Sequence, residues 1–282
     1  MINRNKNYIC YIIKMANTNI KIQEVVAIMD RSGSMAGKIA DSIGGFNSAL
    51  EVLREEQTDN SNINVSVKLF DHEEKMLIRS IPLANVRPLV TRQLIPRGQT
   101  ALLDAMGNTL TYFMEKKLMH PAAYDCCTVY LVTDGMDNCS KTFTRLRIKE
   151  MIRTADLTYN IKVIYLAANQ DAILEAGNLG IKPEQAINYS ESSEETNAAY
   201  RGAAAMVGRH RSGVPVEFLS VERQASQCNN SSQSPPSPPS PLPPPPPPTP
   251  TRSASLFTIG AAPPPVTRQR PHVGWHTNLS RN

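Results

Sequence analysis

The sequence lacks the cysteine patterns of a secreted disulfide scaffold and of a structural zinc site. It has five cysteines, an odd number, and no Cys-x-x-Cys pair. The adjacent Cys126 and Cys127 are expected to pack as small apolar residues at the start of a strand. This cysteine usage favours a reducing, cytoplasmic setting.

The N-terminal region lacks a hydrophobic run long enough to cross a membrane. The run from Tyr8 to Ile13 is too short for a bilayer, and no small-residue cleavage site follows it. We therefore expect no membrane partner and interpret residues 1–18 as an N-terminal extension. Met15 precedes a more ordinary polar stretch and is an alternative start to Met1.

Acidic residues are missing from both ends of the chain. Residues 1–18 and 226–282 hold seven of the 30 basic residues and no Asp or Glu. The net charge of +5 therefore arises at the ends, and the remaining 23 basic residues face 25 acids. A slightly acidic core is a poor phosphate-binding surface, so we expect no nucleic-acid partner.

Large apolar residues are almost absent between Ser231 and Pro250, where twelve of the 22 prolines fall. Such a segment cannot bury a core or form a helix. We predict a disordered Pro-rich tail over residues 226–282 and one folded domain over residues 19–225. The tail is interpreted as a stiff polyproline II spacer, and the alternative is a ligand for an SH3- or WW-type groove.

Apolar runs and amphipathic stretches alternate through the rest of the chain. Strands alternating with helices indicate a doubly wound α/β fold, with a mostly parallel sheet of about six strands and helices on both faces. The acidic turn after Phe70 predicts a hairpin, and therefore one antiparallel strand at the sheet edge. The predicted helices cover residues 37–56, 101–117, 145–156, 170–176 and 192–209, and the strands residues 25–29, 63–70, 76–81, 127–133, 161–167 and 186–189.

Oxygen-bearing side chains follow the buried strands at the edge where a doubly wound sheet binds ligands. Asp30, Ser32 and Ser34 follow the first strand, Thr100 precedes a helix, and Asp134 follows the strand ending at Thr133. Two carboxylates and three hydroxyls are hard ligands of the kind that Mg²⁺ or Mn²⁺ prefers. Five side chains cannot all bind directly and leave room for water, so some are expected to act through water.

These residues match three motifs of a known family. Asp30-Arg31-Ser32-Gly33-Ser34 resembles the Asp-x-Ser-x-Ser signature of the von Willebrand factor A domain and the integrin inserted domain. Thr100 in Gly-Gln-Thr-Ala-Leu and Asp134 in Thr-Asp-Gly are similar to the other two parts of that family's metal-ion-dependent adhesion site. Shorter cues, in residues 43–47, 98–105 and 168–172, resemble a phage and bacterial intracellular subgroup.

The resemblance implies roles for the five residues. Ser32 and Ser34 would bind the metal directly, Thr100 would do so in one state, and Asp30 and Asp134 would act largely through waters. A carboxylate from an Asp or Glu of a partner protein would complete the coordination. The implied function is metal-dependent protein binding.

Several aspartates, including Asp30, also have a purely structural interpretation. Asp30 alone could be a helix cap. Asp71 also follows a strand, but the neighbouring Glu73 and Glu74 favour a solvated turn. Asp104 and Asp137 are interpreted as surface or capping residues.

Enzyme motifs are not found. The sequence has no Asp-x-Asp nucleophile at position 30, no Gly-x-Ser-x-Gly elbow around Ser34 and no complete phosphate loop ending at Lys38. The leading hypothesis is a non-enzymatic, Mg²⁺-dependent protein-binding module. The alternatives are a metal-assisted hydrolase, the regulatory subunit of an ATP-driven complex, and a structural or virion component in which the metal braces loops.

Overall fold

The computed structural model describes residues 21–58, 61–167, 172–190 and 192–227. The N-terminal extension, most of the Pro-rich tail and the proposed SH3- or WW-type motif lie outside the described residues. The predicted boundaries of the extension and the tail therefore stay predictions. None of the helices in the described ranges is long and apolar enough to cross a membrane.

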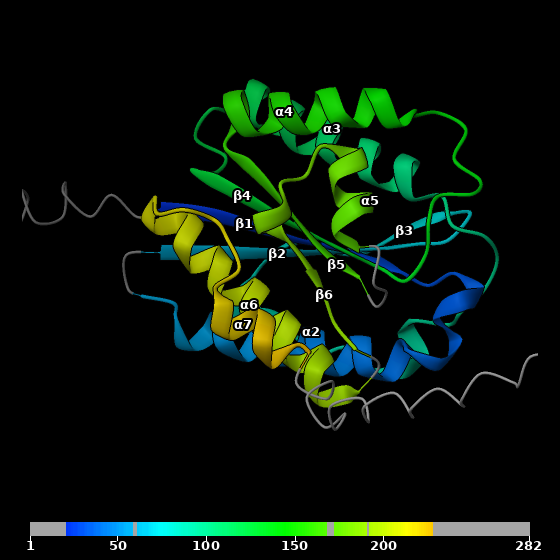
Figure 1. Ribbon diagram of the computed structural model, residues 1–282. Coiled ribbons are helices and arrows are strands. Elements are labelled where there is room, and N and C mark those ends of the chain that lie inside the picture. Colours follow the sequence, from blue (N-terminus) through cyan, green and yellow to red (C-terminus); the bar gives the residue numbers. More distant parts are fainter. Residues whose placement is uncertain (1–20, 59–60, 168–171, 191, 228–282) are drawn as a thin grey trace, which may run out of the picture. The chain divides into compact units, whose positions relative to one another are not determined.

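A six-stranded sheet forms the centre of the domain, in the order β3-β2-β1-β4-β5-β6 (Figure 1). Neighbouring strands are parallel except β2 and β3, which pair antiparallel at one edge as the acidic turn predicts. The doubly wound fold class is therefore confirmed. The strands are β1 (Lys21–Asp30), β2 (Ser61–Phe70), β3 (Glu74–Pro82), β4 (Cys126–Thr133), β5 (Ile161–Ala167) and β6 (Ala186–Asn188).

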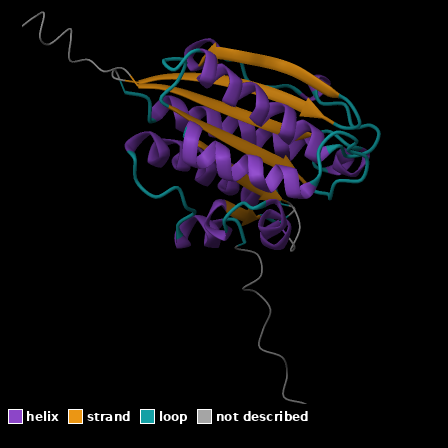
Figure 2. Cartoon of the chain, turned by 90° about the horizontal axis from the view of Figure 1, so that it is seen from above, coloured by secondary structure: helices purple, strands orange, loops and turns teal. Residues whose placement is uncertain are grey.

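Helices cover both faces of this sheet. In Figure 1, α3, α4 and α5 lie above it and α2, α6 and α7 lie below it. Figure 2 shows the strands side by side with helices lying over them. The helices are α2 (Ile39–Glu55), α3 (Leu102–Met119), α4 (Arg145–Tyr159), α5 (Ala172–Leu179), α6 (Ser193–Ser212) and α7 (Ser220–Ala225), with short 3-10 turns η1 (Gly33–Gly37), η2 (Leu83–Asn85), η3 (Thr91–Gln93) and η4 (Pro183–Gln185).

Strand β1 contributes to two separate cores, which explains its continuous apolar run. Side chains alternate across a strand. Val25, Ala27 and Met29 therefore pack on the side of α2 and α6, whereas Val26 and Ile28 pack on the side of α3 and α4. A strand covered on both faces has no solvent-facing positions that would call for polar residues.

Helix α6 begins within one residue of its predicted start, whereas α5 ends later than its predicted range. The Ser192 hydroxyl caps α6 by accepting a hydrogen bond from the Glu195 amide at 3.2 Å. The predicted stop of α5 at Gly177 is wrong, since the helix continues to Leu179. Gly180, with φ of +84°, is the glycine that ends the helix, because only its backbone adopts the left-handed conformation.

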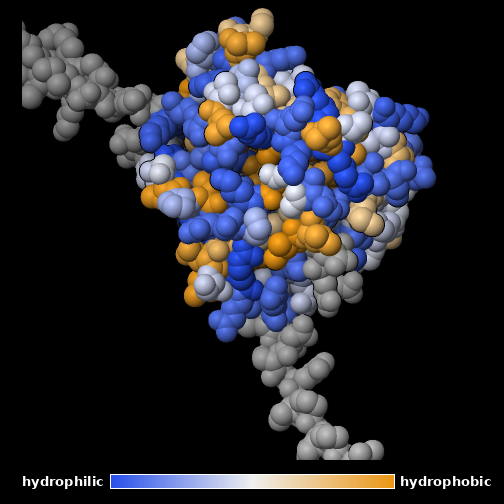
Figure 3. Space-filling model, turned by 45° about the horizontal axis from the view of Figure 1, so that its top comes forward, coloured by the Kyte–Doolittle hydropathy of each residue, from blue (hydrophilic) through white to orange (hydrophobic). Residues whose placement is uncertain are grey.

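Exposed apolar side chains are dispersed. On the face shown in Figure 3, orange patches are separated by polar blue side chains. Helices α3 and α4 leave five large apolar residues exposed, namely Tyr112, Leu118, Met119, Leu146 and Leu157. Cys126 and Cys127 are buried with free thiols at the start of β4, as expected.

Candidate metal centre

Three loops carry the predicted site residues: the first follows β1 and holds Asp30, Ser32 and Ser34, the second holds Thr100, and the third follows β4 and holds Asp134. The first and third of these candidate metal loops leave the sheet side by side. Met29 of β1 pairs in register with Val132 of β4. Asp30 is therefore next to Thr133 at the carboxyl edge, and Asp134 begins the loop that follows β4. Parallel strands thus bring together two acids that are distant in sequence.

The Asp30 carboxylate is held by hydrogen bonds from the loop after β1 and from the end of β4. Its Oδ1 accepts from the Ser32 amide at 2.6 Å, and its Oδ2 accepts from the Thr133 hydroxyl at 2.7 Å. Asp30 and Ser32 are each 1 % exposed. Helix α2 begins only at Ile39, so Asp30 is not its cap.

The hydroxyl groups of the first loop connect to Asp134. The Ser32 and Ser34 Oγ atoms are 3.1 Å apart, and Ser34 Oγ donates to Asp134 Oδ1 at 2.7 Å. The other Asp134 oxygen, Oδ2, accepts from the Lys38 ammonium group at 3.1 Å. The sequence analysis did not assign Lys38 to the site, and its place eight residues after Asp30 carries no metal signature.

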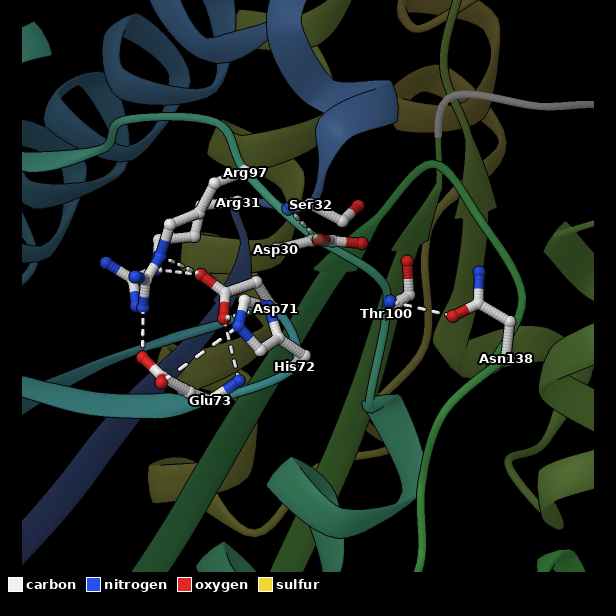
Figure 4. Close-up of polar contacts among 9 residues, drawn as sticks. All are labelled: Asp30, Arg31, Ser32, Asp71, His72, Glu73, Arg97, Thr100 and Asn138. Carbon is white, nitrogen blue, oxygen red and sulfur yellow. Dashed lines mark hydrogen bonds and ion pairs between the residues drawn. The ribbon is translucent and has the colours of Figure 1, made fainter.

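The second loop brings Thr100 to the same place. The Thr100 backbone N–H donates to Asn138 Oδ1 at 2.9 Å (Figure 4). The Asn138 backbone N–H donates to the Thr100 carbonyl at 3.0 Å. A Cβ built on Gly135 would lie 3.9 Å from Ser34 Oγ and 4.0 Å from Thr100 Oγ1. The two hydroxyls therefore face the space beside Gly135, and the structure brings all five predicted site residues together.

The buried carboxylates make this place suited to a cation. Burial raises the pKa of Asp30, hydrogen bonds from Thr133 and Ser32 oppose this rise, and the nearby Asp134 carboxylate adds to it. Two carboxylates in a poorly solvated place repel each other unless a cation lies between them. The donor set, two carboxylates and three hydroxyls, fits a hard divalent ion.

The prediction that Asp71 lies in a solvated turn is wrong. Asp71 is fully buried, and its Oδ2 lies 2.9 Å from the Nε atoms of both Arg31 and Arg97 (Figure 4). Two guanidinium groups compensate the carboxylate, which makes its burial tolerable. The sequence signal that could have indicated this is the position of Asp71 directly after a buried strand, as for Asp30.

Asp71, His72 and Glu73 also bring potential metal-ligand atoms within 4.8 Å of one another. The Asp71 carboxylate is already engaged by the two arginines, and its Oδ1 accepts from the Glu73 amide at 2.7 Å. Because Arg97 also pairs with Glu73, a metal there would compete with guanidinium groups. We assign no metal to this cluster.

The capping interpretation of Asp104 and Asp137 agrees with the structure. Asp104 accepts from the amides of residues 141–143, at 2.8–2.9 Å. Asp137 accepts from the Leu103 amide at 3.2 Å. Together they attach the third metal loop to the start of α3.

Comparisons with known proteins identify the fold. No family model and no curated protein matches the sequence. Among solved structures, the pilus adhesin SpaC from Lactobacillus rhamnosus GG, in an open conformation, is similar with a TM-score of 0.50 and 14% identity, over 68% of this chain and 30% of that one. This chain has a von Willebrand factor A fold. Its mostly parallel six-stranded sheet and its antiparallel edge strand agree with the fold predicted from the sequence.

Two further solved structures are similar to this von Willebrand factor A fold at low identity. A von Willebrand factor type A protein from Catenulispora acidiphila has a TM-score of 0.48 and 16% identity, over 67% of this chain and 43% of that one. Proximal thread matrix protein 1 of the mussel byssus has a TM-score of 0.49 and 12% identity, over 67% and 46%. The chain spans less than half the length of these proteins.

Proposed function

We propose that this chain is a divalent-metal-dependent protein-binding module. Asp30, Ser32, Ser34, Thr100 and Asp134 would hold Mg²⁺ or Mn²⁺, and an Asp or Glu carboxylate of a partner protein would complete the coordination. The observation that carries the proposal is the meeting of these five oxygen-bearing side chains, from three separate loops, at the carboxyl edge of the sheet.

The charges at the site support an anionic partner. Asp30 and Asp134 bring two negative charges, and Lys38 returns one positive charge through its contact with Asp134. A bound divalent ion would leave one positive charge in excess, which a single carboxylate neutralises. The serine hydroxyls would bind the metal directly and the aspartates largely through water, as the resemblance implies.

Binding is favoured over catalysis because the polar groups at the site hydrogen-bond to one another, and we assign none of them as a catalytic base. The hydrogen bonds that Asp30 and Asp134 accept include bonds from hydroxyls, an amide and an ammonium group. Hydrolysis at a metal would ask for a positioned base with a pKa near neutrality. We assign no such base to the residues around the site.

Calorimetric titration of the full chain with Mg²⁺ and Mn²⁺ tests the metal site. Asp30→Ala and Thr100→Ala are expected to weaken binding at least tenfold, since each removes an oxygen. Gly135→Ala should also weaken it, because its methyl group would lie 3.9 Å from the Ser34 hydroxyl and 4.0 Å from the Thr100 hydroxyl, where it would hinder metal and water. Gly135 has no positive φ, so alanine is compatible with its backbone.

Gly177→Ala is the matched control. It also adds one methyl group, but in open space on α5. Its metal affinity should equal that of the wild type. Absence of binding heat from the wild type at millimolar metal would refute the proposal. For the partner, proteins retained in Mg²⁺ and released by chelator should lose retention when their carboxyl groups are amidated.

A further inference from the structure

Asp71 lies at the end of β2, directly beside the first metal loop. Asp30 pairs in register with Phe70, and the Arg31 amide donates to the Phe70 carbonyl at 2.8 Å. Asp71 is therefore the neighbour of Arg31 across the two strands. A fully buried carboxylate at this position is costly unless it is paired, and its partners come from the metal loops.

Each of two metal loops sends one arginine to this carboxylate. Arg31 occupies a variable position of the Asp-x-Ser-x-Ser motif, and its side chain extends to Asp71, as does that of Arg97 from the second loop (Figure 4). Arg31 is only 9 % exposed, whereas Arg97 is 44 % exposed and also pairs with Glu73. One carboxylate thus links the first loop to the second.

Backbone hydrogen bonds join the same segments. The Arg97 amide donates to the Arg31 carbonyl at 2.9 Å, and the Gly33 amide donates to the Gly98 carbonyl at 3.1 Å. The Ala101 amide donates to the Asp71 carbonyl at 2.8 Å. Residues 97–101 are therefore attached at three points around Thr100.

The turn after β2 also packs directly on the second loop. Gly98 has φ of +66°, and a Cβ at this position would lie 2.0 Å from His72 Nδ1. The loop can approach the turn this closely only with glycine. The position of Thr100 relative to Ser32 and Ser34 thus depends on the turn that holds Asp71.

We propose that Asp71 is a positioning residue of the metal site. Its buried carboxylate, held between Arg31 and Arg97, fixes the second loop against the first and places Thr100 for metal binding. This inference rests on the proposed function of the site. Residues that orient metal ligands in this way typically change affinity by about 10–100-fold when mutated.

The test measures the Mg²⁺ dissociation constant of the full chain by calorimetry. Asp71→Asn, which keeps the shape of the side chain and removes its charge, should raise the constant at least tenfold. Arg97→Gln should raise it less, because Arg31 still contacts Asp71. Arg209→Gln is the control, because it also removes an arginine from an ion pair. Arg209 Nη1 donates to Glu222 Oε2 of α7 at 3.1 Å. This change should leave the dissociation constant unchanged.

A double-mutant cycle separates positioning from general loosening of the fold. If Asp71 acts through Thr100, Asp71→Asn should weaken binding in the wild type and have little further effect in Thr100→Ala. Equal effects in both backgrounds would overturn the inference, as would an unchanged constant in Asp71→Asn. If Asp71→Asn does not fold, Arg97→Gln replaces it in the cycle. A smaller effect of Arg97→Gln in Thr100→Ala than in the wild type would support the inference, and equal effects would overturn it. If the wild type binds no metal, the proposed function itself fails.

Discussion

His210 is a buried histidine on α6 that the fold keeps neutral. It is 6 % exposed, and its two ring nitrogens lie 2.9 Å from Thr128 Oγ1 and Asn160 Oδ1. Burial lowers the pKa of His210 to about 4, with a further lowering from Lys162 and an opposing effect of Asp156. Protonation would place a charge where the surroundings do not solvate it.

The lowered pKa predicts a stability that depends on pH. In the unfolded chain histidine titrates near 6.5, so between about pH 6.5 and 4 the unfolded state binds more protons than the folded state. The contribution of His210 is complete above about pH 6.5 and declines as the pH falls to about 4, by up to about 3 kcal/mol. Urea denaturation between these pH values should show this slope.

His210→Gln should flatten that slope, because glutamine does not titrate. His120→Gln, at an exposed position, should retain it. Equal slopes in His210→Gln and the wild type would show that other groups cause the pH dependence.

At the residue scale, the sequence indicated which oxygen-bearing side chains lie together at the sheet edge, and it missed the buried ion pairs. Asp30, Ser32, Ser34, Thr100 and Asp134 could be found because their types recur in motifs at strand ends. The burial of Asp71 was missed, because the arginines that compensate its charge are distant from it in sequence. Local composition around Asp71, with Glu73 and Glu74 beside it, favours the opposite interpretation.

Helices α2 and α6 approach closely at a glycine of α2. Gly45 faces the ring of Tyr200, and a Cβ there would lie 2.4 Å from Cδ2 of that ring. Tyr200 is fully buried, so its ring cannot swing into solvent. We expect Gly45→Ala to lower the free energy of unfolding by about 1–3 kcal/mol through overpacking.

The neighbouring Gly44 provides the matched control. A Cβ on Gly44 would lie 3.7 Å from Asn197 Oδ1, an ordinary contact. Gly44→Ala should therefore stabilise the protein by about 0.5–1 kcal/mol, the usual helix gain of alanine over glycine. Urea denaturation measures both variants, and equal stability of the two would contradict the close packing of α2 on α6.

At the element scale, periodicity predicted which segments are helices and strands because both faces of the sheet are covered by regular amphipathic helices. The end of α5 was missed because Gly177 and Gly180 look alike in sequence. Only the backbone conformation distinguishes a tolerated glycine inside a helix from one that terminates it. The end of a helix that is set by one residue's φ is therefore harder to predict from sequence than the presence of the helix, which follows from its pattern of buried apolar residues.

For the domain as a whole, the segment after α6 completes the sheet edge at β6. Phe218 is 5 % exposed, and its amide donates to the Glu184 carbonyl at 2.8 Å. Arg223 donates to the Ala186 carbonyl at 2.8 Å, and the Ser226 hydroxyl donates to the Asn188 carbonyl at 3.0 Å. These contacts attach residues 218–226 to η4 and β6, while the predicted domain boundary at residue 225 stays a prediction.

Two truncated chains test this boundary. A chain of residues 21–227 keeps the contacts of Phe218, Arg223 and Ser226 given above and should unfold at the same urea concentration as the full chain. A chain of residues 21–212 loses the burial of Phe218 and the Arg223 hydrogen bonds, which together should cost at least about 3 kcal/mol. It would also leave β6 with an uncovered edge, so it should form aggregates that size-exclusion chromatography detects. Equal stability of the two truncated chains would show that residues 213–227 are dispensable to the domain.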